Sequence, residues 1–403
     1  MTANHTRARP PRRLVDLDAE RPGHGVDVDR VAALLTVGDP LADAVIAELD
    51  RHGARARNAL ATGLRRGLAS LSPQPPTAVA ALLRHLEATP SRVDPLMLHR
   101  GDLVSLSVPP MWFELCSVTS ALAYVYRSPA VARALTGTGG PADVAVRLAE
   151  TGVWARRTIQ PGGLLRGGPG YVATVEARLA HARMRATALA DWNRGVRGLP
   201  VGHLDLARTW LGFTLVAYRC LAGVGIDISR DEERSLYQYW SYVAHLLGLD
   251  ESLTSDLVDH EGARRLHDLL DATTAGPDEH STALTAAMID AQSHAVAGTP
   301  GAVLPEEQVR QLIGSVLRQA FGDQWGVDLP GFPGTSAATD LMPLINHLNR
   351  QARYWQTYSP GSAQEARRRP LEEPGPQPRA ATHFCGLSCR RHTAADCPAF
   401  RAA

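Results

Sequence analysis

Apolar residues recur at three- and four-residue spacing along most of this chain, and proline or glycine interrupts the pattern at short intervals. Such spacing places apolar side chains on one face of a helix, whereas a half-buried strand needs alternation. Asp39 followed by Pro40 is a typical helix start, and Val45 and Leu49 then share one face. A strand-like piece is confined to 102–108. The sequence therefore predicts an all-α protein.

One large helical domain is expected over residues 27–358. Residues 1–26 are rich in Arg, Pro and Asp and are predicted to be disordered, and residues 359–403 read as a Pro- and Arg-rich linker followed by a Cys/His tail. A chain of 403 residues can bury a large core. Helices are predicted at 39–53, 55–71, 77–88, 111–127, 129–136, 141–157, 171–192, 204–222, 229–248, 252–274, 280–297, 305–321 and 337–357.

The chain contains no lysine, which removes several classes of enzyme. A P-loop, a protein kinase site and a pyridoxal Schiff base all require that residue. The formal net charge of +1 suggests no polyanionic partner, so no nucleic-acid partner is expected. Composition leaves other enzyme classes open and does not indicate an oligomeric state.

The chain start lacks the marks of an export signal. No apolar stretch follows Arg12 and Arg13, whereas a signal peptide needs one, so we expect a cytoplasmic protein. No window reaches the ~18 uninterrupted apolar residues of a membrane span. The most apolar window, 211–228, is interrupted by Arg219.

The predicted helix at 141–157 carries polar residues on its core face. Val144, Arg147, Leu148, Thr151 and Trp154 form one stripe at helical spacing. A buried arginine needs a charged partner or a polar cavity, because an unpaired buried charge costs several kcal/mol. Two interpretations follow: an arginine–carboxylate pair that closes the core, or a ligand pocket.

The predicted helix at 171–192 places His181 between two arginines. Arg178, His181 and Arg185 lie at i, i+3 and i+7, beside an apolar stripe that includes Val175 and Leu179. A neighbouring cation disfavours the charged imidazolium and so favours the neutral ring that binds metals. His181 is therefore a candidate iron ligand, with an adjacent arginine meeting a propionate. The alternative is an ordinary helical histidine, since the chain has fifteen.

Several motifs, in order and at characteristic spacing, carry a resemblance to a known family. From Gly38 to about Leu249 the chain resembles the latex clearing protein branch of the bacterial oxygenase family that also includes the mycophenolic acid pathway oxygenase. The matching pieces are G-D-P-L-A-D-A-V at 38–45, R-x-x-x-T at 147–151 with Trp154 after it, R-L-x-H-A at 178–182, D-W at 191–192, G-L-P-V at 198–201 with Asp205 and Thr209 following, and W-x-Y-x-x-x-L-L-G at 240–248.

The resemblance implies a globin-like helical bundle with additional helices around a pocket for non-covalent haem b. His181 would then be the proximal iron ligand, and Arg147 and Thr151 would lie on the distal, oxygen-binding side. Arg178, Arg185 and Trp154 are the further candidate cofactor contacts.

Two departures from the family pattern affect the substrate more than the haem. Glu150 stands where latex clearing proteins tend to carry a basic residue just before the distal threonine, and Gly202-His203 replaces a polar pair. Glu150 could supply the distal base of that branch, or it could be a solvated surface glutamate.

The resemblance predicts a haem b-dependent oxygenase that uses O2 to cleave or oxygenate a C=C bond. The substrate would be an apolar isoprenoid-like molecule or a secondary metabolite. One alternative is a haem-based oxygen or redox sensor without turnover, in which His203 or His245 would supply a second axial ligand. Another is a helical scaffold without a cofactor.

The end of the chain offers a second candidate metal site. Cys385, Cys389, His392 and Cys397 could ligate zinc, or the three thiolates could bind an iron–sulfur cluster. Their spacing matches no standard zinc finger, so a disordered tail with incidental thiols is the alternative. No C-x-x-C-H motif for covalent haem attachment occurs in the sequence.

Overall fold

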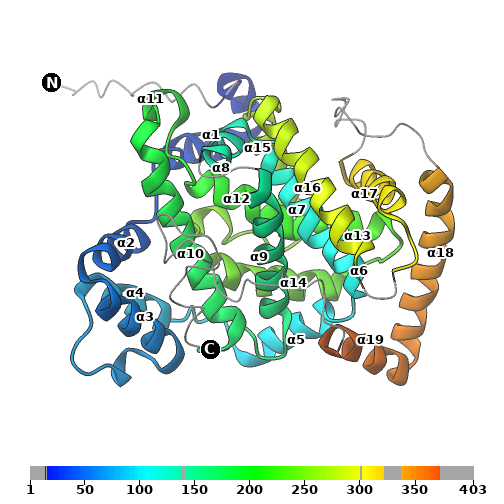
Figure 1. Ribbon diagram of the computed structural model, residues 1–403, viewed down its shortest axis with the longest axis horizontal. Helices are drawn as coiled ribbons and strands as arrows, with labels where there is room; N and C mark the ends of the chain where they lie inside the picture. Colours follow the sequence, from blue (N-terminus) through cyan, green and yellow to red (C-terminus); the bar gives the residue numbers. More distant parts are fainter. Residues whose placement is uncertain (1–13, 15, 138–140, 300–301, 322–336, 373–403) are drawn as a thin grey trace.

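The computed structural model describes residues 14, 16–137, 141–299, 302–321 and 337–372, and within them the chain is built from helices (Figure 1). The described residues form no strand, and one isolated β-bridge joins Leu14 to Thr274. The prediction of an all-α protein is confirmed. None of the described helices combines the length and apolar character needed to span a membrane.

The helices follow one another with short connections. Their bounds are α1 Leu17–Leu34, α2 Pro40–His52, α3 Ala54–Arg66, α4 Thr77–Glu87, α5 Pro95–Ser105, α6 Pro110–Trp112, α7 Ser120–Tyr126, α8 Pro129–Thr136, α9 Pro141–Ile159, α10 Pro169–Ala188, α11 Arg194–Arg197, α12 His203–Leu211, α13 Ala217–Gly223, α14 Arg230–Leu246, α15 His260–Ala272, α16 Glu279–Ala297, α17 Glu306–Phe321, α18 Ala337–Tyr358 and α19 Pro360–Glu372. Two π-helical segments, η2 Phe113–Thr119 and η4 Gly212–Val216, precede α7 and α13.

Local sequence signals explain where several helices begin. The Asp39 carboxylate accepts a hydrogen bond from the Ala42 amide at 3.1 Å and caps α2. Ser229 and Glu232 form a capping box at the start of α14. Proline occupies the first position of α9, where its fixed φ suits a helix start. These caps satisfy amide groups that helix geometry leaves without a partner.

Three segments differ from expectation. The strand-like piece at 102–108 begins inside α5, where Asp94 caps the helix and Pro95 opens it. Helix α1 begins within the segment predicted to be disordered, and it buries Val28 and Val31. Helix α19 lies within the predicted linker; its exposed Glu365 pairs with arginines three and four residues later, which supports a helix without burial.

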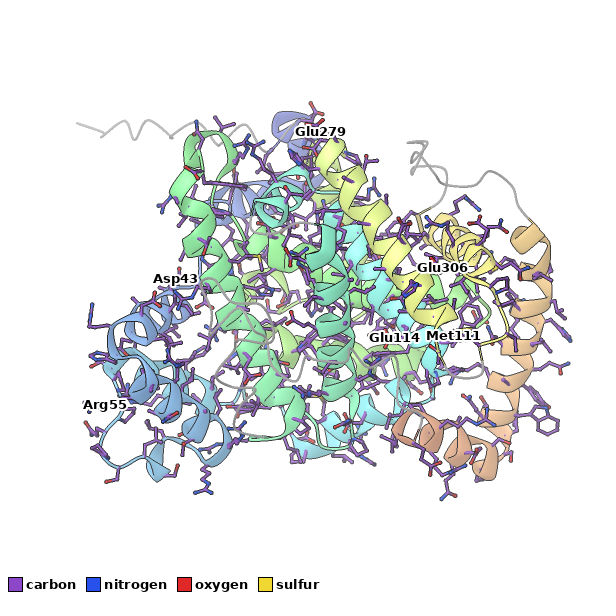
Figure 2. All side chains as sticks on the ribbon, viewed as in Figure 1. Asp43, Arg55, Met111, Glu114, Glu279 and Glu306 are labelled. Carbon is purple, nitrogen blue, oxygen red and sulfur yellow. The ribbon has the colours of Figure 1, made fainter. Side chains whose placement is uncertain are left out.

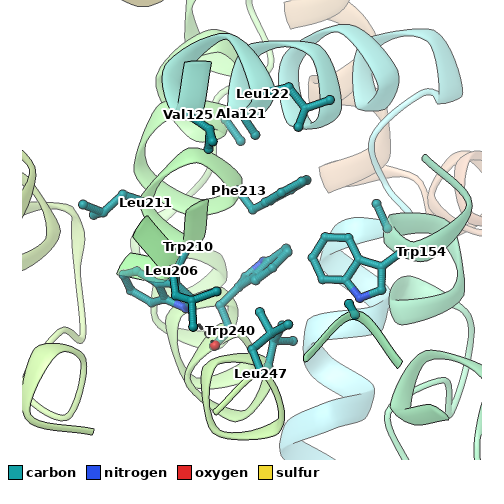
Figure 3. Close-up of a cluster of buried hydrophobic side chains, with 14 of the residues drawn as sticks. Ala121, Leu122, Val125, Trp154, Leu206, Trp210, Leu211, Phe213, Trp240 and Leu247 are labelled. Carbon is teal, nitrogen blue, oxygen red and sulfur yellow. Dashed lines mark hydrogen bonds between the residues drawn. The ribbon is translucent and has the colours of Figure 1, made fainter. Parts of the chain in front are cut away.

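The core around α9, α12 and α14 contains a layer of aromatic side chains (Figure 3). The ring of Phe213 meets Trp154 edge-on at 4.9 Å between centroids and stacks on Trp240 at 5.6 Å. Trp210 donates its indole N–H to the Trp240 carbonyl at 2.8 Å. Large rings with satisfied polar groups make this layer rigid.

Helix α7 covers this layer closely (Figure 3). A side chain on Gly212 would place its Cβ 3.0 Å from the Ala121 backbone, so a larger residue would require η4 and α7 to move slightly apart. Within η2, Glu114 (labelled in Figure 2) is buried, and it forms an ion pair with Arg156 of α9. The ion pair connects α9 to η2 and so helps to fix α9 against the core.

Candidate active site

Helices α9 and α10 form an antiparallel pair whose register is set near their connection. Trp154 of α9 donates its indole N–H to the Thr174 hydroxyl of α10 at 3.1 Å. Nearer the connection, the backbone of Gly170 lies so close to Arg157 that an added Cβ would be 2.5 Å from its carbonyl oxygen. Seven residues are about two helical turns. Two turns from the Trp154–Thr174 bond, Arg147 therefore lies opposite His181.

His181 has no hydrogen-bond partner in the part of the chain that the structure describes. Its ring is partly buried and its Nδ1 atom is wholly buried. Burial, and after it the charge of Arg185, lower the pKa of His181 to about 4, against the opposing effects of Asp39 and Asp205. The ring is therefore neutral at neutral pH, the form that can donate a nitrogen lone pair to a metal.

Arg147 also has an unsatisfied polar group. Its Nη1 atom is buried without a hydrogen-bond partner, although the residue as a whole is half-buried. Among the described residues no carboxylate pairs with it, so the core-closing ion pair considered for Arg147 is not found there. Thr151 lies one turn further on the same face and donates its hydroxyl to the Arg147 carbonyl at 2.7 Å. That bond fixes the hydroxyl against the helix backbone.

The remaining candidates on α9 occupy different surroundings. Trp154 is buried in the aromatic layer and joins it to Thr174 of α10. Glu150 is half-buried and, at 100° per residue, lies on the flank of the stripe that faces α10. Its role as a base stays a prediction.

Both arginines beside His181 are held by aspartates of α2 or its cap. Arg178 is buried and donates from Nε and Nη2 to Asp39 at 2.5 and 2.9 Å. Arg185 donates from Nε and Nη2 to Asp43 at 3.0 and 2.8 Å and also bonds the Val201 carbonyl. The ion pairs hold α10 against α2 and its cap. The contact of either arginine with a propionate stays a prediction.

The two histidines considered as second axial ligands have partners of their own. His203 contacts the Gly38 carbonyl through Nε2 at 2.9 Å and accepts the Asp250 amide through Nδ1 at 3.2 Å. His245 contacts Glu251 through Nδ1 at 3.3 Å and stacks on His85 at 4.9 Å between centroids. These contacts fit a structural role for His203, whereas the Nε2 atom of His245 is buried without a hydrogen-bond partner among the described residues.

A cavity of about 30 Å³ lies on the far side of the aromatic layer from Trp154. Phe213 and Trp240 form part of its wall, and the hydroxyl of Tyr218 is buried there without a hydrogen-bond partner. Arg353 of α18 borders it and bonds Ser107 at 3.0 Å. This volume accommodates about two water-sized spheres.

Sequence analysis did not single out two residues that the structure places beside the candidates. Asp39 was recognised only as a helix cap, yet it also neutralises Arg178. Tyr126 of α7 lies beside Arg147 and belongs to no motif. Its only sequence signal is its place in an apolar helix. The tail candidates Cys385, Cys389, His392 and Cys397, and with them the zinc or iron–sulfur prediction, lie outside the described residues.

Comparison with known proteins identifies the class of this all-helical chain. Residues 114–329, just over half of the sequence, match the family model described as ER-bound oxygenase mpaB/B'/Rubber oxygenase, catalytic domain. The chain belongs to this family of oxygenases. Both Arg147 and His181 lie inside the matched region.

A solved structure of latex clearing protein in the closed state has the same fold. It matches with a TM-score of 0.64 at 22% sequence identity, covering 86% of this chain and 93% of that chain. No curated protein sequence matches the chain. The resemblance inferred from the motifs is therefore confirmed at the level of family and fold.

Proposed function

We infer that this oxygenase uses non-covalent haem b, with His181 as the residue that would bind its iron. The observation that carries this proposal is that His181, a neutral histidine, and Arg147, which the helix register places level with it, each have a buried nitrogen without a hydrogen-bond partner. Leaving two buried polar groups unsatisfied costs about 1–3 kcal/mol each, which a bound group could offset. A haem fits the donor set, since it offers an iron for an imidazole and acceptor groups for a guanidinium.

Haem supplies the redox chemistry that activates dioxygen, and the protein controls ligation, polarity and access. His181 would hold the group through a ring nitrogen, with burial and Arg185 keeping the ring neutral. Arg147 would supply a positive donor on the opposite helix. Thr151, bonded to the Arg147 carbonyl, would order the helix behind that donor.

The proposed substrate is an apolar molecule with a C=C bond, of isoprenoid or secondary-metabolite type, which the enzyme cleaves or oxygenates. The family description, which includes rubber oxygenases, supports this class. A sensor in which His203 is a second ligand is less well supported, since both ring nitrogens of His203 already have partners.

The test is the absorption spectrum of protein expressed with ample haem, before and after reduction with dithionite. Wild type should show a Soret band, and His181→Ala should lose or strongly alter it. His52→Ala, at an exposed histidine ending α2, is the matched control and should resemble wild type. A Soret band that is identical in all three proteins would remove His181 from the proposal, and no band in any of them would refute haem binding.

A further inference from the structure

Two tyrosines on α7 have opposite surroundings. Tyr124 and Tyr126 are both fully buried. The Tyr124 hydroxyl donates to Asp271 at 3.1 Å, and the guanidinium of Arg208 lies 4.5 Å from its ring centroid. The Tyr126 hydroxyl has no hydrogen-bond partner among the described residues. Tyr124 is thus accounted for by packing, whereas Tyr126 is not.

The polar neighbour of the Tyr126 hydroxyl is Arg147. Burial raises the pKa of Tyr126, and the nearby Arg147 opposes that effect through its charge and its contact with the phenol oxygen. The two side chains are not oriented to form a hydrogen bond with each other, because both the Tyr126 hydroxyl and Arg147 Nη1 have no hydrogen-bond partner. Helices α7 and α9 therefore bring two unsatisfied polar groups together inside the protein.

The chemistry of these groups defines what is missing. A guanidinium only donates hydrogen bonds. A phenol can accept one, but its own proton still needs an acceptor, so a small rotation that bonded Arg147 to Tyr126 would leave a donor unsatisfied. Together with the positive charge, this favours an acceptor oxygen that carries negative charge.

We propose that Tyr126 and Arg147 form a subsite that binds a negatively charged oxygen of a ligand in the α9–α10 site. This inference rests on the proposed haem function. The oxygen can come from a haem carboxylate or from a diatomic ligand in the pocket. Both sources offer the same chemistry to the two donors, and the experiment separates them.

The first arm compares thermal unfolding of the haem-free, full-length proteins. Tyr124→Phe should lower the Tm by about 2 °C or more, because it removes a bond to Asp271. Tyr126→Phe should leave the Tm unchanged or raise it, because its hydroxyl has no partner to lose. A Tyr126→Phe Tm that falls as far as that of Tyr124→Phe would show an ordinary structural hydrogen bond and overturn the subsite.

The second arm loads wild type, Tyr124→Phe and Tyr126→Phe with haem or with haem dimethyl ester. If the oxygen is a haem carboxylate, Tyr126→Phe should weaken haem binding roughly five- to tenfold, and the ester should abolish the difference between variant and wild type. Tyr124→Phe should bind both forms as wild type does.

The third arm records the C–O stretch of the ferrous carbonyl form, with carbon monoxide as the probe. If the oxygen is that of a diatomic ligand, haem affinity should be unchanged, and the stretch should move to higher wavenumber in Tyr126→Phe, since a donor near the oxygen is lost. Unchanged affinity together with an unchanged stretch would overturn the subsite. A wild type without a Soret band would instead refute the proposed function, and the subsite with it.

Discussion

His181 and Arg147 lie opposite each other on antiparallel helices, and each has a buried nitrogen without a hydrogen-bond partner among the described residues. The Trp154–Thr174 bond two turns away sets that register. Because an unsatisfied buried polar group is costly, the packing of α9 and α10 fits a protein that gains stability when a ligand occupies the space between them.

The ion pair of Arg178 and Asp39 should be important for stability. Both side chains are 4% exposed, so Arg178→Met leaves an uncompensated buried carboxylate and should cost roughly 3–5 kcal/mol of unfolding free energy. The matched control is Arg183→Met on the same helix, which breaks a similar pair of hydrogen bonds to Asp50. Because the Asp50 side chain is 44% exposed, this substitution should cost about 1 kcal/mol of unfolding free energy or less. Urea unfolding measures both; equal costs would contradict the prediction.

The depressed pKa of His181 should make stability depend on pH. The folded value of about 4 lies below the unfolded value of 6.5, so the unfolded chain binds more protons between them. His181 therefore contributes stability above pH 6.5 that is lost as pH falls from 6.5 towards 4. In the haem-free protein, His181→Asn should reduce the pH dependence of the unfolding free energy between pH 4 and 6.5. Urea unfolding at several pH values measures this. A slope identical to that of wild type would count against it.

The same pKa predicts how a metal ligand at His181 would respond to acid. An ordinary histidine would be mostly protonated at pH 5.5, and the proton would compete with iron. With a folded pKa of about 4, His181 should keep haem bound at pH 5.5. Spectrophotometric titration of the holoprotein measures this, and loss of haem with a midpoint near pH 6.5 would show that the ring is not buried as described.

Asp102 should respond to pH in the opposite direction. Burial raises its pKa to about 6, against the hydrogen bond that it accepts from the Gly162 amide at 2.9 Å. A raised carboxyl pKa gives stability that is full below pH 3.8 and is lost as pH rises through 6. Asp102→Asn keeps an acceptor for Gly162 and should raise the Tm above pH 6 relative to wild type. Asp231→Asn, at a 93% exposed side chain, should not.

The effects of substituting Trp154 and Thr174 on stability should not be additive, because the hydrogen bond between them sets the register of α9 and α10. Trp154→Phe and Thr174→Val each remove one partner of the 3.1 Å bond, and each should cost about 1–3 kcal/mol by leaving the other group unsatisfied. The double variant should cost less than the sum of the two single ones. Urea unfolding of the four proteins closes the cycle, and strict additivity would indicate that the bond contributes nothing to stability.

The sequence by itself determined the all-α class and the main helices, because helical periodicity and caps such as Asp39 act over a few residues. It also determined that Arg147 and Thr151 share a face, since both lie on one helix. The family motifs were readable in the same way, as short local strings.

Only the tertiary structure decided which polar groups are satisfied. Asp39 meets Arg178 across 139 positions of the chain, and no local spacing encodes that pair. The same holds for Tyr126 and Arg147, which come from different helices. Helix α1 begins where composition suggested disorder, and α19 lies where it suggested a linker. Burial of Val28 and Val31 in α1, and ion pairs along α19, outweighed the weak local preference.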